Sequence, residues 1–140
     1  MFKRISGKPR LEWYPKIAST VINYGGLMYP DGSGAIQPAD STSGNHLGVS
    51  MKAVAAADSD YAANTKIPVD VVGEDDVFEA TVTGTLTTAM VGNFYDLSTD
   101  LVVNVGATSK KVVLCVGFIS ATLGLFKISA RAADFYVATS

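Results

Sequence analysis

The sequence has very few residues with which to build a metal site or a disulfide. Its 140 residues include one cysteine, Cys115, and one histidine, His46. A structural zinc site needs about four nitrogen or sulfur ligands, and a disulfide needs two cysteines. We therefore expect no metal, no cofactor and no intrachain disulfide. Cys115 lies within an apolar run, which is typical of a buried, inert thiol and suits folding in a reducing cytoplasm.

Charge and long hydrophobic runs are also scarce. Only 17% of the residues are charged, against about 25% in ordinary domains. The longest apolar run covers residues 112–119, far less than the roughly 20 residues of a membrane-spanning helix. The basic N-terminus is not followed by a long apolar segment, so we expect neither a signal peptide nor a membrane anchor. The low charge favours a protein that assembles with partners.

No motif for catalysis or nucleotide binding is present. The chain has no Gly-x-Ser-x-Gly elbow and no Walker or dinucleotide fingerprint. His46 adjoins a loop, and we interpret it as a strand-edge or interface residue. Two acidic groups, at residues 58–60 and 74–76, lack the spacing of an EF-hand. Asp70 and Glu79 fall inside apolar strands, where we expect them on the solvent face of a hairpin. We therefore predict a protein without enzymatic activity.

Short alternating or apolar stretches, separated by turn residues, indicate a fold made of β-strands. Pro68 cannot donate to a ladder, which predicts either an edge strand or the start of a strand at this position. The acidic turn at residues 73–76 predicts a hairpin between the strands on either side. No long segment has helical periodicity, so we predict an all-β fold, a single compact β-sandwich or small β-barrel. The main predicted strands are residues 46–52, 67–72, 77–85, 111–120 and 125–130, with a further strand possible near Phe135, Tyr136 and Val137.

Residues 1–16 differ from the rest of the chain. They hold five of the eleven basic side chains but only one of the thirteen acidic ones, and glycine and proline interrupt them. We predict an extended basic N-terminal arm, residues 1–16, on a single β domain, residues 17–140. The arm either packs on its own domain or inserts its aromatic pair into a neighbouring protein. Its candidate interface residues are Lys3, Arg4, Lys8, Arg10, Trp13, Tyr14 and Lys16.

The order of features from about residue 25 to residue 130 resembles the small decoration, or cement, proteins of tailed-bacteriophage capsids. The resemblance starts at a Pro-Asp-Gly turn after Tyr29. The segments that carry it further are Lys66-Ile67-Pro68-Val69-Asp70-Val71, Phe78-Glu79-Ala80, Val91-Gly92 with Tyr95-Asp96-Leu97, and Gly117-Phe118-Ile119-Ser120. It implies a compact β-barrel or sandwich, often trimeric, that sits on the major capsid lattice and has no catalytic residues.

We therefore expect a virion structural protein that folds in the host cytoplasm, binds the outer surface of an assembled capsid and stabilises it. Its partners would be the major capsid protein and further copies of itself, with a trimer favoured. The acidic body makes nucleic acid an unexpected partner. Two alternatives remain open: another virion subunit, such as a head-fibre base, a tail-tube or a head–tail connector protein, and a carbohydrate-binding β module. The module would use exposed aromatics, for which the loop candidates are Tyr24, Tyr29 and Tyr61.

Overall fold

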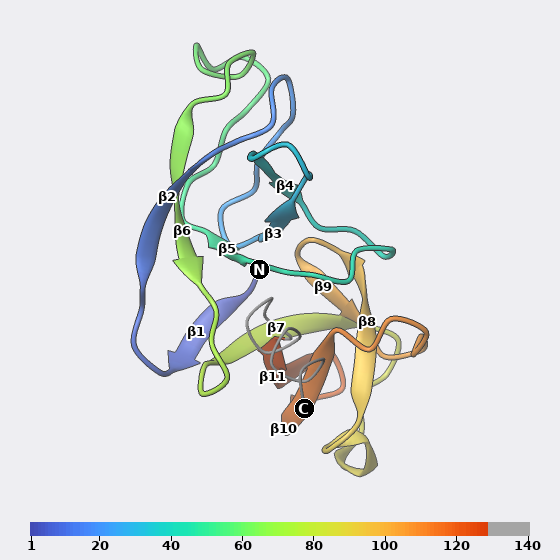
Figure 1. The fold of residues 1–140 in the computed structure, drawn as a ribbon. Helices are drawn as coiled ribbons and strands as arrows, with labels where there is room; N and C mark the ends of the chain where they lie inside the picture. Colours follow the sequence, from blue (N-terminus) through green and yellow to red (C-terminus); the bar gives the residue numbers. More distant parts are fainter. Residues whose placement is uncertain (129–140) are drawn as a thin grey trace.

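The computed structural model of the chain describes residues 1–128 and confirms the prediction of an all-β fold with a small barrel. The end of the predicted strand at 125–130 and the possible strand near Tyr136 lie outside the described residues. Two sheets contain all the described strands (Figure 1). The elements are β1 Lys3–Ser6, β2 Leu11–Pro15, β3 Leu27–Pro30, β4 Ile36–Pro38, β5 Gly48–Ser50, β6 Lys66–Val71, β7 Val77–Thr83, the 3₁₀ turn η1 Thr88–Met90, β8 Phe94–Thr99, β9 Val102–Asn104, β10 Val113–Ser120 and β11 Leu123–Ile128.

Five strands close into a barrel in the order β7-β11-β10-β8-β9. The parallel pairing of β9 with β7 completes the ring, and β1 occupies the part of the same β7 edge that β9 leaves open. Alternate residues of β7 point inward, as its sequence predicts: Phe78, Ala80 and Val82 are buried. The cluster that fills the barrel also includes Leu27 and Val49 from the second sheet. The two sheets therefore share one core.

The second sheet has the order β2-β6-β5-β3-β4, and all its strands are antiparallel. One face packs against the barrel, and the other covers a smaller apolar cluster. The two edge strands of the sheet approach each other at one point, where the Ile17 N–H donates to the Ile36 carbonyl at 2.9 Å. The sheet therefore curls around the smaller cluster, whose members are Ile22, Met28, Ile36, Val54, Ile67 and Val69.

Two predictions about the strand that contains Pro68 are wrong: the edge position, which was one of two alternatives, and the hairpin across the acidic turn. This strand, β6, lies inside the second sheet between β2 and β5, and it does not form a hairpin with β7. Pro68 is tolerated because its carbonyl accepts the Met51 N–H at 3.0 Å, one residue beyond the end of β5. Because proline has no N–H group, the ladder between β5 and β6 lacks a single hydrogen bond, and that bond would lie at its end. β6 and β7 separate because β6 pairs with β2, whereas β7 pairs with β1, β9 and β11.

The first sixteen residues do not form a separate arm, so the predicted boundary at residue 16 is wrong. β1 belongs to the barrel sheet and β2 to the second sheet. Phe2 is only 1% exposed and belongs to the main core. Of the two alternatives for this segment, the structure shows the one in which it packs on its own domain. Burial of Phe2 supplies apolar stabilisation that a free arm would lack.

Replacing Phe2 tests whether the N-terminus is part of the core. We expect Phe2→Ala to lower the free energy of unfolding by about 3 kcal/mol, because a buried aromatic ring is lost and a cavity remains. The control is Ile5→Ala in the same strand, where the side chain is 48% exposed and the change should stay within about 0.5 kcal/mol. Urea unfolding measures both. Equal, small effects would show that residues 1–16 contribute little to the fold.

Candidate binding surface at the N-terminal strands

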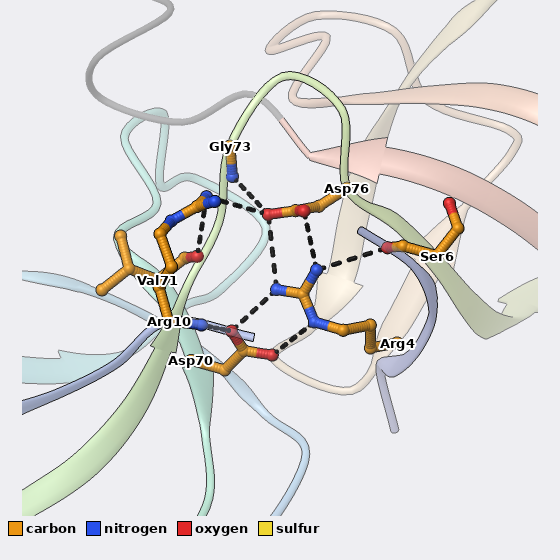
Figure 2. A network of polar contacts seen from close by, with 7 residues as sticks. All are labelled: Arg4, Ser6, Arg10, Asp70, Val71, Gly73 and Asp76. Atoms are coloured by element: carbon orange, nitrogen blue, oxygen red, sulfur yellow. Dashed lines mark hydrogen bonds and ion pairs between the residues drawn. The ribbon is translucent and has the colours of Figure 1, made fainter. Parts of the chain in front are cut away.

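A buried ion-pair network joins the two N-terminal strands to the rest of the molecule (Figure 2). Arg4 of β1 donates from Nη2 and Nε to the two carboxylate oxygens of Asp70 on β6, at 2.7 and 2.8 Å. Its Nη1 lies 2.7 Å from Oδ1 of Asp76, which precedes β7. The planar guanidinium thus contacts two carboxylates at once, a geometry that arginine provides and lysine does not.

The segment between β1 and β2 completes the same network. Arg10 lies 3.1 Å from Oδ2 of Asp76, and the Gly73 N–H donates to that oxygen at 2.8 Å. The Arg10 N–H donates to Asp70 at 3.2 Å. Gly7 turns the chain with φ of 92°, and a Cβ at this position would collide with the Asp76 carboxylate. The network therefore joins β1, the start of β2, the end of β6 and the loop that leads to β7.

Asp70 does not lie on a solvent face, contrary to the prediction. It is 3% exposed because β1 lies over it and Arg4 fills the space between the two sheets. Sequence periodicity places Asp70 correctly on the face opposite Val69, but it does not reveal that another strand covers that face. A buried carboxylate needs a charged partner, and the apolar residues next to Asp70 in the sequence do not supply one. Its burial was therefore not expected from the sequence.

The charges and hydrogen bonds in this network shift the pKa values of Arg4 and Asp76 in the stabilising direction. The Asp70 hydrogen bond raises the pKa of Arg4, and the Asp76 interactions add to this against the effect of burial. Burial acts to raise the pKa of Asp76. Hydrogen bonds from Arg4 and the Gly73 amide, with the charges of Arg4 and Arg10, outweigh burial and hold that pKa below its ordinary value of 3.8. Asp76 is therefore a charged carboxylate at neutral pH.

Lys16, another predicted interface residue, is fully buried. Its Nζ donates to the carbonyls of Tyr61 and Ala63, at 2.9 and 2.6 Å. The Asn64 side chain donates in return to the Lys16 carbonyl at 2.8 Å. Lys16 therefore fixes the loop that precedes β6, and its ammonium is not available to a partner.

The seven predicted interface residues fall into two groups. Lys16 is buried, Arg4 is partly buried and bonded to Asp70, Tyr14 packs on the smaller cluster, and Arg10 is tied to Asp76. The remaining members, Lys3, Lys8 and Trp13, are exposed. For Trp13 and Tyr14 the difference follows from strand geometry, because neighbouring residues of β2 face opposite sides of the sheet.

The structure adds one residue that sequence reasoning missed. Leu11 is 55% exposed and lies two residues before Trp13, which is 61% exposed. The two side chains share one face of β2, where Leu11 lies opposite Asp70 and Trp13 lies opposite Pro68. We call Leu11 and Trp13 the β2 apolar pair. The Leu-x-Trp spacing was the available signal, but it is readable only once residues 11–15 are known to form a strand.

Other groups that could support chemistry have structural partners. His46, predicted at a strand edge or interface, is fully buried, with Nε2 3.0 Å from the Ser43 hydroxyl. Ser43 also donates to the Asp40 carbonyl at 2.9 Å, so these residues stabilise their own loop. Cys115 is buried as predicted, and burial raises the pKa of its thiol. Among residues 1–128, no three His, Cys, Asp or Glu side chains are grouped so that they could hold a metal ion.

Comparison of the chain with protein-family models found no family that matches, and comparison with curated proteins found no match. Within the described part of the chain, no helix is long and apolar enough to cross a membrane.

The depressed pKa of Asp76 predicts a pH-dependent contribution to stability. Its folded pKa is below the unfolded value, so the contribution is complete above the unfolded pKa and is lost as pH falls through the folded pKa. Asp76→Asn should therefore cost about 2 kcal/mol near pH 7, where hydrogen bonds to a charged group are lost. The difference from wild type should shrink below about pH 4.

Urea unfolding at pH values from about 7 to about 3 measures this difference. The matched control is the exposed neighbour Asp75→Asn, which should change stability by less than about 0.5 kcal/mol near pH 7. A cost for Asp76→Asn that stays constant over this range would contradict the depressed pKa.

Proposed function

We propose that this protein is a non-enzymatic structural protein that binds the outer surface of an assembled tailed-phage capsid through the β2 apolar pair. The observation that supports it is the 61% exposure of Trp13, the only tryptophan, on a strand held firmly in a sheet. Tryptophan is the side chain most enriched at the centres of protein interfaces. Its exposure on a folded domain therefore favours a docking role.

The strand that carries Trp13 is rigid before any partner binds. β2 pairs with β6 along its whole length, and the buried contacts of Arg4 and Lys16 fix the chain on both sides of it. The entropy cost of ordering this segment is therefore met during folding. A preorganised anchor binds more tightly than a flexible one with the same contacts.

The charge around the β2 apolar pair favours an acidic partner. Lys8 is exposed just before β2 and, unlike Arg10, makes no ion pair among the described residues, while Glu12 is the only acidic residue on the strand. On a capsid, a binder that recognises only the assembled lattice stabilises it by mass action. A trimer would present three copies of the surface and gain affinity by multivalency.

Co-sedimentation with empty, expanded capsids tests this function. The capsids are assembled from the major capsid protein encoded in the same genome as this chain. We expect wild-type protein to bind, and Trp13→Ala to weaken binding by about 30-fold, which corresponds to about 2 kcal/mol for a central anchor.

The matched control is Phe94→Ala, which removes an aromatic ring that is 46% exposed on β8 of the barrel. It should bind as wild type does. A wild-type protein that ignores capsids would contradict the proposed function. Equal affinities for wild type and Trp13→Ala would contradict the role of the β2 apolar pair.

A further inference from the structure

The outer edge of β2 carries backbone groups that have no partner among residues 1–128. Within this part of the chain, β2 is the end strand of its sheet and pairs only with β6. The Lys16 N–H donates to the Thr65 carbonyl at 3.0 Å, and the Val71 N–H donates to the Arg10 carbonyl at 2.9 Å. Because hydrogen-bonded pairs alternate in an antiparallel ladder, Glu12 and Tyr14 bond to β6, whereas Leu11 and Trp13 point their N–H and C=O groups away from it.

No hydrogen bond from residues 1–128 reaches these four outward groups of Leu11 and Trp13. Pro15 lacks an N–H group and so removes one donor from the same edge. No other feature of residues 1–128 blocks the pairing of a further strand with it. Such an edge is a ready template for another extended chain. The geometry of the ladder therefore specifies the conformation of the occupant as a β-strand.

An apolar hollow of about 300 Å³ lies beside this edge. It is lined by Tyr14 of β2 and by residues near β4, the other edge of the sheet. β2 and β4 meet only around Lys16 and Ile36, so the hollow marks the gap between the two edge strands. Its other lining residues are Pro30, Gly34, Ala35, Ile36 and Leu47.

We propose that an extended segment of the major capsid protein adds to the outer edge of β2 as a sixth strand of the second sheet. This inference rests on the proposed function and deepens it by specifying how the partner is held. Alternate side chains of the added strand face the two sides of the sheet. Apolar residues on one side lie near the β2 apolar pair, and an apolar residue on the other side enters the hollow beside Tyr14. Main-chain bonds supply affinity, and the hollow supplies specificity.

Charge favours this occupant over a second copy of the chain. An antiparallel pair of β2 strands from two copies would point Lys8 of each copy toward the end of the other copy's β2, where Lys66 lies one strand further, opposite Pro15. Positive charge would then collect at both ends of the pair, which is unfavourable. A strand with acidic residues at the end that approaches Lys8 avoids this repulsion.

Proline substitution separates backbone pairing from side-chain contact. Trp13→Pro and Trp13→Ala both remove the indole, but only proline also removes the outward N–H. Neither variant loses a bond to β6, because the Trp13 N–H does not point to that strand. Leu11→Pro and Leu11→Ala form a second, independent pair. Thermal unfolding of all four variants checks that the sheet is intact.

Affinity for the same capsids is then compared within each pair by co-sedimentation. Strand addition predicts that each proline variant binds about tenfold more weakly than its alanine counterpart, as expected for one lost backbone bond. Folded proline and alanine variants with equal, measurable affinities would overturn strand addition while leaving the proposed function in place. Wild-type protein that does not bind capsids would overturn both. Light scattering could instead show a dimer that is abolished by Trp13→Pro but kept by Trp13→Ala. That result would mean that the strand added to β2 comes from a second copy of this chain and not from the capsid protein.

Discussion

The contact of Arg4 with Asp70 and Asp76 is the interaction on which the rest of the structure depends. The two carboxylates lie at either side of the point where the chain passes from the second sheet to the barrel. Without a cation between them, the two buried carboxylates would repel each other. Each would also be removed from water with no opposite charge to compensate for the loss of hydration. Arg4 and Arg10 together balance the two negative charges, and the contacts of Arg4 join β1 to both carboxylates. The junction of the two sheets is therefore made by a side chain from the N-terminal strand.

This junction also determines which surface the protein presents. Once Arg4 fixes β1 and Arg10 joins Asp76, β2 is placed alongside β6 and its apolar pair faces outward. The basic charge of the first sixteen residues is largely used within the molecule, by Arg4, Arg10 and Lys16. What remains for a partner is an exposed tryptophan, a leucine and an unpaired strand edge. In the proposed function, the residues that stabilise the fold thus differ from those that bind the capsid.

Sequence patterns predicted the parts of this structure that depend on local information. The alternation of Phe78, Ala80 and Val82 indicated a strand with these side chains on one face, and short strands spaced by turn residues indicated the all-β class. Pairing between distant segments was not predictable in this way. The turn at 73–76 has the composition of a hairpin turn. However, β6 and β7 belong to different sheets, because β6 pairs with β2 and β5, whereas β7 pairs with β1, β9 and β11. The basic residues at the N-terminus indicated an acidic partner, and the sequence alone could not show that Asp70 and Asp76 of the same chain fill that role.

Amide hydrogen exchange of residues 11–14 tests the central claim most directly. We expect the Glu12 and Tyr14 amides, which bond to β6, to be protected in the free protein, whereas the Leu11 and Trp13 amides exchange rapidly. On capsids, the Leu11 and Trp13 amides should become protected as well. Rapid exchange at all four positions would show that the N-terminal segment is not part of the sheet. Protection of all four in the free protein would show that the edge of β2 is already covered.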